Sequence, residues 1–307
     1  MLEVLKLSSP QDVLRTSATC RSWKRVCSSQ ELWQAFSDML QLRTCLDALS
    51  FKLEFRTAYC LAETEGAGTR IYNCLSESWR TVHHLNLPFG LTSACTWLPS
   101  GDLFVCGGFE PCIATAALVE VETGKIRELP SMNQARGLHS VVAYGMCVYV
   151  FSGYDGAVVR SCEKLDLEQG LWAQLPDSPD GAVNSGACLL NESIYQCGTE
   201  FNTLLAFRLL TQQFQPTGIK VPTQGAVRSC VAVGGEVLIL STEEVRRWSE
   251  GKQVTVQRVR ALCGGWWGCM RPICVQGRVC VLSDRRLLQV FCLESQQCRT
   301  HAIPEAN

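Results

Sequence analysis

Short runs of apolar residues, bounded by turn signals, recur along most of the chain. Six of them end at a spacing of 42 to 45 positions, with last residues Glu63, Gly108, Gly153, Gly198, Ser241 and Ser283. A second apolar run and a turn signal precede each one, most clearly at residues 140–145 and 229–234. Two strand-like runs separated by a turn predict a β-hairpin in every unit. The six runs are residues 58–63, 103–108, 148–153, 193–198, 236–241 and 278–283.

Each hairpin is followed by a loop and two further strand-like segments, as in residues 162–167 and 171–175. Four strands and about 40–50 residues per unit are typical of a propeller blade, and propellers close with roughly 4–8 blades. We therefore predict a mainly β fold, a six-bladed β-propeller over residues 56–307. A single four-stranded sheet leaves apolar faces uncovered, so we expect the core to lie between neighbouring blades.

Glycines at the ends of the second strands have an expected structural role. They stand where inner strands crowd toward the axis and turn, so a side chain would clash or the backbone would need a positive φ. These glycines are Gly107, Gly108, Gly153 and Gly198.

Residues 1–40 have apolar positions at helical spacing and no strand alternation. A helix start is indicated by Ser9 as N-cap, Pro10 at the first helical position and Asp12 in the first turn. We predict a small helical unit over residues 1–40 and a partly helical linker over residues 41–55.

Composition and charge narrow the classes of partner. The chain is 47% hydrophobic and has a formal net charge of −1, so it has the apolar content of a cored globular protein and no overall field that attracts nucleic acid or an anionic membrane. Its longest apolar runs, such as residues 141–151, are about half the ~20 residues of a membrane-spanning helix. The start lacks the basic and apolar regions of a secretory signal. We expect an intracellular protein, cytoplasmic and also nuclear, with no nucleic-acid or membrane partner.

The 19 cysteines are scattered, and none forms a Cys-x-x-Cys pair. Without a secretory signal we expect reduced, buried thiols at strand positions, where free cysteine behaves as a small hydrophobe. These positions include Cys106, Cys147, Cys197, Cys280 and Cys292. The gaps between Cys263, Cys269, Cys274 and Cys280 are too irregular for a zinc site, so we predict no metal.

The sequence contains no recognisable catalytic motif. The chain has no Gly-x-Ser-x-Gly elbow, Walker loop or His-Glu-x-x-His sequence. In a strand the adjacent pair His83-His84 would point to opposite faces, and His139 is expected to be a hydrogen-bonded blade residue. We therefore predict no catalytic residues, no cofactor and a non-enzymatic role.

The third repeat resembles a kelch repeat. It has Arg136 and His139 ahead of its first strand, residues 152–156 (Ser-Gly-Tyr-Asp-Gly) after its second, and Trp172 in its fourth. The second repeat keeps Gly107-Gly108, while the last two lack the glycine pair. A divergent WD40-like propeller stays open as an alternative. Galactose oxidase also has kelch-like blades, but its copper-binding Tyr and His set has no counterpart here.

The N-terminal segment resembles an F-box, the helical motif that docks onto the Skp1 adaptor of cullin-RING ubiquitin ligases. Cys20-Arg-Ser-Trp23 and the later Leu32-Trp33 carry the resemblance. The start of the motif is missing, so we expect a truncated or alternative product, or weak adaptor binding. A structural helical cap on the propeller is the alternative. The resemblance implies adaptor contacts at Leu5, Pro10, Leu14, Cys20, Trp23, Leu32 and Trp33.

Together the two resemblances imply a substrate receptor, with a Skp1-type adaptor and cullin complex bound through residues 1–40 and a protein substrate bound by the propeller. A stand-alone kelch-propeller scaffold is the alternative. Because rigid blades hold variable loops at one end of the channel, we expect the substrate to contact those loops. The candidates are Glu110, Arg136, Tyr154, Asp155, Glu200, Asn202, Arg228, Trp266, Trp267, Arg271, Arg285 and Arg286.

Overall fold

The computed structural model describes Leu32, Ala35 and most of residues 59–302. The gaps are residues 65–67, 74–77, 83–92, 110, 121–124, 184–185, 199–202, 222–228, 242–243, 251–254, 259–271, 276–277, 283–286 and 296. The chain divides into two compact units, Met1–Tyr59 with Asn73–Ser78 and Cys60–Tyr72 with Trp79–Asn307. Among the described residues, no helix has the length and hydropathy needed to cross a bilayer.

In the first unit, Leu32 and Ala35 have helical backbone and Leu32 is buried. The rest of the predicted helical segment lies outside the described residues, as does the predicted linker. The domain boundaries at residues 40 and 55 stay predictions.

In the second unit, five sheets are four-stranded and antiparallel, with strands in sequence order. The first contains β4 (Ala94–Trp97), β5 (Leu103–Cys106), β6 (Ala116–Glu120) and β7 (Lys125–Leu129). The next contains β8 (Ser140–Tyr144), β9 (Cys147–Phe151), β10 (Cys162–Asp166) and β11 (Leu171–Leu175). The third contains β12 (Gly186–Leu190), β13 (Ser193–Cys197), β14 (Thr203–Arg208) and β15 (Gln213–Lys220). The fourth contains β16 (Ser229–Val233), β17 (Glu236–Leu240), β18 (Glu244–Trp248) and β19 (Thr255–Arg258). The fifth contains β20 (Ile273–Val275), β21 (Arg278–Leu282), β22 (Leu287–Cys292) and β23 (Cys298–Ala302).

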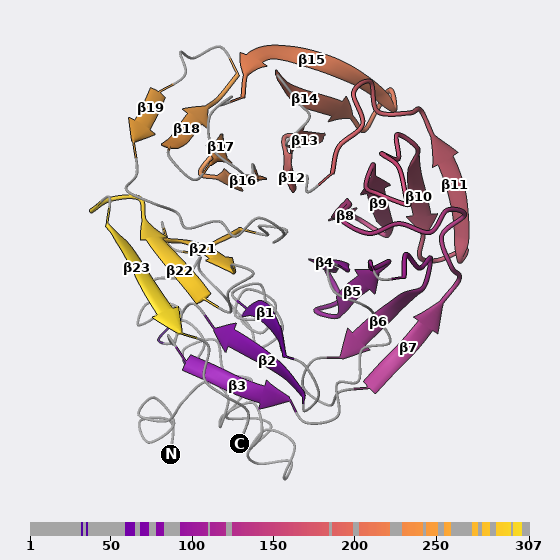
Figure 1. Ribbon diagram of the computed structural model, residues 1–307, viewed down its shortest axis with the longest axis horizontal. Helices are drawn as coiled ribbons and strands as arrows, with labels where there is room; N and C mark the ends of the chain where they lie inside the picture. The colour runs from indigo at the N-terminus through magenta and orange to yellow at the C-terminus, as the bar shows by residue number, and fades with distance from the viewer. Residues whose placement is uncertain are drawn as a thin grey trace. The chain divides into compact units, whose positions relative to one another are not determined.

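These sheets follow one another as propeller blades (Figure 1). The first strand of each sheet contacts the first strand of the next, from β4 through β8, β12 and β16 to β20. The prediction of a mainly β propeller is confirmed. The predicted second strands at residues 103–108, 148–153, 193–198, 236–241 and 278–283 contain β5, β9, β13, β17 and β21.

The predicted number of blades is wrong, because the described residues form five four-stranded blades and not six. A further sheet has three strands, β1 (Tyr59–Thr64), β2 (Gly68–Asn73) and β3 (Ser78–Val82). Here β1 occupies the predicted second-strand run, and among the described strands it pairs with β2 alone. The repeat period counts apolar runs, but it does not show whether a fourth strand completes each sheet.

Burial falls from the second strand of a blade to its fourth. In the first four-stranded blade all of β5 is buried, whereas β7 is largely exposed. β13 and β15 differ in the same way. A strand buried on both faces needs a continuous apolar run, whereas an outer strand can alternate. This gradient explains why the second strands gave the clearest repeat signal in the sequence.

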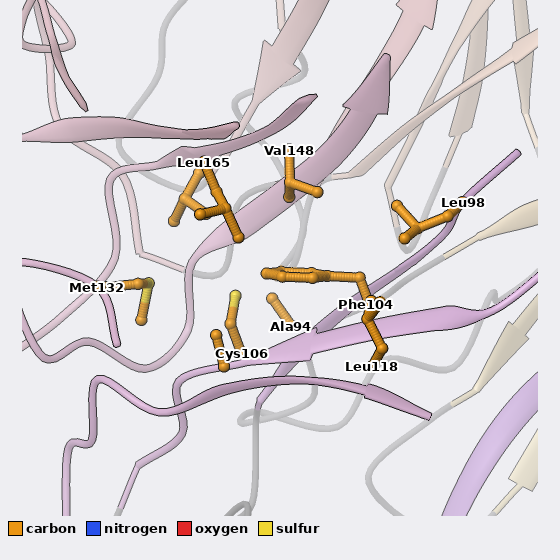
Figure 2. Packing of buried hydrophobic residues seen from close by; sticks show 10 residues of the cluster. Ala94, Leu98, Phe104, Cys106, Leu118, Met132, Val148 and Leu165 are labelled. Atoms are coloured by element: carbon orange, nitrogen blue, oxygen red, sulfur yellow. The ribbon is translucent and has the colours of Figure 1, made fainter. Parts of the chain in front are cut away.

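The core lies between blades, as the repeat argument predicted. Phe104 of β5 packs with Val148 of β9 and Leu165 of β10 (Figure 2), and these three residues are fully buried. Three further clusters each join consecutive blades in the same way. Trp172 of β11 packs against the cluster of Figure 2 and its indole Nε1 donates to Pro130 O at 2.8 Å. Each four-stranded blade therefore shares its buried surface with its neighbours.

Candidate functional site

The candidate site begins with the tight turns that follow β5 and β9. Gly107 has φ of +64°, and a Cβ there would lie 2.4 Å from Arg136 O and 2.5 Å from His139 Cε1. Gly153 has φ of +113°, and its Cβ would lie 2.7 Å from Gly137 O. The structural role predicted for these two glycines is confirmed, since each permits a close approach of the segment that precedes β8.

A buried ion pair holds that segment in place. Arg136 Nη2 lies 2.7 Å from Glu163 Oε1, and both side chains are fully buried. The guanidinium also donates to Ser152 O at 2.9 Å and to Ser161 O at 2.6 Å. These bonds tie the entry to β8 to both ends of the loop between β9 and β10.

The Glu163 carboxylate accepts further hydrogen bonds from the same entry segment. The backbone N–H of Asn133 donates to Oε2 at 2.7 Å, and that of Gln134 donates to Oε1 at 3.2 Å. The side-chain amide of Asn133 adds a third bond at 2.8 Å. Both charges are thus compensated inside the protein. The prediction that Arg136 contacts a partner is corrected, because no part of its side chain reaches the surface.

The His139 side chain lies against the turns at Gly107 and Gly153. It is buried, and its Nε2 lies 3.2 Å from Cys106 Sγ. The prediction of a hydrogen-bonded blade histidine is confirmed. Of the cysteines singled out by the sequence, Cys106, Cys197 and Cys280 are buried as predicted, while Cys147 and Cys292 are partly exposed.

Directly after the two turns, side chains of two consecutive blades contact each other. The backbones of Gly137 and Tyr154 exchange two hydrogen bonds, at 3.0 and 2.9 Å. The Tyr154 ring lies edge-on to Phe109, with centroids 5.8 Å apart, and Cys112 Sγ donates to Tyr154 O at 3.2 Å. Burial raises the pKa of the Cys112 thiol, and the Asp155 carboxylate raises it further. Cys112 is therefore a neutral donor that ties the two loops together.

We call this set the loop surface, and it is accessible. Phe109, Cys112 and Tyr154 are partly exposed, and Asp155 and Val158 are exposed. An aromatic pair beside a carboxylate, held by paired backbones, can contact an apolar group and a hydrogen-bond donor of a partner. Aromatic side chains are enriched at such contacts.

A second loop, between β11 and β12, supports the loop surface. Arg160 donates to the carbonyl oxygens of Ser178 and Pro179. A Cβ at Gly181 would lie 2.8 Å from Val158 Cγ1, so Val158 rests directly on this glycine. The loop that bears Tyr154 and Asp155 is therefore held on two sides.

The structure places the predicted site residues in different environments. Tyr154 and Asp155 lie together on the loop surface, Arg136 lies in the interior, and Leu32 is buried in helical backbone. The remaining predicted residues lie outside the described part of the chain. They are Leu5, Pro10, Leu14, Cys20, Trp23, Trp33, Glu110, Glu200, Asn202, Arg228, Trp266, Trp267, Arg271, Arg285 and Arg286.

The sequence reasoning missed Phe109, Cys112 and Val158. Phe109 could have been identified from the sequence, because it follows Gly107-Gly108 as Tyr154 follows Ser152-Gly153. Aligning the two repeats would have paired the aromatic rings. Within the described ranges, no group of three or more His, Cys, Asp or Glu side chains is arranged to hold a metal ion.

Comparison with known proteins agrees with these features. The F-box-like family model matches residues 1–38, and the Kelch motif model matches residues 135–179, the blade that carries Arg136, Tyr154 and Glu163. Neither match indicates a catalytic family.

Similar proteins carry kelch repeats. The chain is 31% identical over 103 residues to Kelch-like protein 23 of Homo sapiens, which covers 32% of this chain and 18% of the relative. It is 25% identical over 134 residues to Kelch repeat and BTB domain-containing protein 2 of Ectromelia virus (strain Moscow), which covers 42% of this chain and 23% of the relative. The matches thus span about a fifth of each relative's own length. An F-box-like segment matched ahead of a kelch motif in a β-propeller supports the resemblance of this chain to F-box/kelch-repeat proteins.

Proposed function

We propose that the chain is a non-catalytic substrate-recognition subunit of a Skp1–cullin–F-box ubiquitin ligase. The observation that carries the proposal is the F-box-like match over residues 1–38 ahead of a kelch propeller. Residues 1–40 bind a Skp1-type adaptor, residues 41–55 link them to the propeller, and residues 56–307 bind the substrate. The subunit accelerates ubiquitin transfer by holding the substrate near another enzyme.

The propeller supports the substrate-binding part of this proposal. Its loop surface is backed by the buried pair Arg136–Glu163, so Tyr154 and Asp155 stand on a rigid base. A preorganised surface loses little conformational entropy on binding. The loops of Glu200, Asn202, Arg228, Trp266, Trp267, Arg271, Arg285 and Arg286 extend the proposed substrate contacts.

We expect the full chain to retain purified Skp1 in a pull-down, and the Trp23→Ala variant to lose it. An F-box aromatic contributes buried apolar area at the adaptor interface, and such residues are typical hot spots. Circular dichroism and the thermal midpoint should stay close to those of the wild type.

Two outcomes contradict the ligase proposal. Absence of Skp1 binding, persisting after a complete first F-box helix is added, removes its basis. Unfolding of Trp23→Ala would instead identify residues 1–40 as a structural cap and favour a stand-alone scaffold.

We expect Tyr154→Ala to weaken substrate binding by about 2 kcal/mol, roughly 30-fold, because a rigid aromatic anchor is lost. The matched control is Tyr144→Ala. Tyr144 is 40% exposed and is the last residue of β8, at the end of that strand opposite to the loop surface. Quantitative affinity purification compares the proteins captured by the two variants. Captured proteins that are lost with Tyr144→Ala and kept with Tyr154→Ala would place the substrate site elsewhere.

A further inference from the structure

Three cysteine thiols from two neighbouring blades meet in one buried cluster. Cys188 lies on β12, Cys197 on β13 and Cys230 on β16. Their exposed fractions are 8%, 0% and 2%, and they share an apolar core with Tyr195 and Trp248. Six of the twelve cysteines that the structure describes are buried. This cluster differs because the thiols face one another across a blade boundary.

The two blades approach very closely at this point. A Cβ at Gly186 would lie 2.7 Å from Ser229 Cα and 2.8 Å from Cys230 N, so β12 and β16 are in backbone contact there. Cys188 follows Gly186 by two residues and Cys230 follows Ser229 by one. Because a strand advances only about 3.3 Å per residue, both thiols stay near the point of contact. β12 is the strand of its blade that packs most extensively on β16.

The Cys230 sulfur lies over the β12–β13 strand pair. It is 3.4 Å from Gly186 O and 3.3 Å from Tyr195 O. Tyr195 is the residue directly opposite Cys188 in the strand register. The Cys230 sulfur therefore contacts a carbonyl oxygen on each of the two strands, on either side of Cys188.

The thiols are also in hydrogen-bonding contact. Cys230 hydrogen-bonds to Cys188 and to Cys197. Its hydrogen bond to Cys230, together with burial, raises the pKa of Cys188. Burial opposes ionisation of Cys230, but these hydrogen bonds together lower its pKa. The thiolate is the nucleophilic form of cysteine, so one of the two thiols must lose its proton before the pair can react.

We propose that Cys188 and Cys230 form a disulfide that joins two neighbouring blades when the chain is oxidised by a peroxide. The thiolate of one of the two cysteines attacks one peroxide oxygen and the O–O bond breaks, so that a sulfenic acid forms and the other oxygen leaves as hydroxide, which takes up the proton that the thiol released and becomes water. The partner thiol then attacks the sulfenic sulfur, the S–S bond forms, the S–O bond breaks, and a second water leaves. Both sulfurs are oxidised and one peroxide is reduced.

This link would join the third and fourth four-stranded blades without changing the loop surface, which lies on the first two. It is independent of the proposed ligase function. A disulfide requires Cα atoms within about 4.4–6.8 Å, and the backbone contact at Gly186 brings β12 and β16 together beside both cysteines.

The test uses the reduced full-length chain, treated with a small excess of hydrogen peroxide and digested without reductant. Mass spectrometry should find a link between the peptides that contain Cys188 and Cys230. The intact mass should fall by two hydrogens, and dithiothreitol should reverse both changes. Cys188→Ala should abolish the link.

The control is Cys162→Ala, because Cys162 is buried in another blade and burial raises its pKa to about 11. This variant should keep the Cys188–Cys230 link in full. A link from Cys230 to Cys197, a link between other thiols, or no link in the wild type would overturn the proposal. The decisive sample is the wild type, so a folding defect in either variant does not affect the result.

Discussion

Replacing Glu163 with alanine is expected to lower the free energy of unfolding by about 3–5 kcal/mol, because the change leaves the Arg136 guanidinium buried without its counter-charge. It also removes the acceptor of the Asn133 and Gln134 backbone N–H groups. Urea denaturation followed by tryptophan fluorescence measures the loss.

The control for this prediction is the exposed pair Arg208–Glu250, whose side chains are 33% and 67% exposed. Glu250→Ala should change the free energy of unfolding by less than about 1 kcal/mol, since exposed ion pairs contribute little. The double variant Arg136→Met with Glu163→Leu should be less destabilised than the sum of its two single variants, because neither charge is then left alone. Equal losses in Glu163→Ala and Glu250→Ala would contradict the role given to the buried pair.

Gly107→Ala is expected to destabilise the propeller by about 2–5 kcal/mol. Part of the cost is the left-handed backbone, about 1–2 kcal/mol for a residue with a Cβ. The rest arises because the added Cβ would lie 2.4 Å from Arg136 O, a backbone atom that the buried ion pair prevents from moving away. Overpacking of this kind costs about 1–3 kcal/mol.

Gly145→Ala separates the two contributions. Gly145 has φ of +59°, close to the +64° of Gly107, but a Cβ there meets nothing within 4 Å. Its variant should lose only the backbone contribution. Thermal denaturation of both variants gives the difference, and equal midpoints would show that crowding at Gly107 carries no cost.

The sequence predicted the strands well because burial and apolar runs coincide in this fold. β5 and β9 are buried along their whole or nearly whole length, and each reads as an uninterrupted apolar run. β13 is also fully buried, although it contains Ser193 and Gln196. The number of complete blades was not predictable in the same way. Strand pairing depends on partners that the period of a single run does not encode, as the three-stranded sheet of β1 shows.

For the candidate site, the sequence did not predict the direction of every side chain. Arg136 looked like a loop cation because its polar character suggests exposure. Its partner Glu163 lies in β10, and nothing in the local sequence links the two residues. Tyr154 and Asp155 lie in the loop that follows the second-strand glycine, and their contact with a substrate stays a proposal. Ser152 adopts a φ of +56° in the position that Gly107 occupies one repeat earlier, so the turn, and not the residue type, is what the repeats share.

The cores shared between blades also bear on how such a chain can change in length. Phe104 is covered by residues of the following blade, and Phe207 of β14 packs with Phe151 of the preceding one. Deleting one repeat from the gene would therefore uncover apolar faces on both flanking sheets, whose side chains were not matched to each other. Repeats of this chain can be duplicated or lost only when the new neighbours fit, which makes the junction between two repeats the unit on which selection for folding acts.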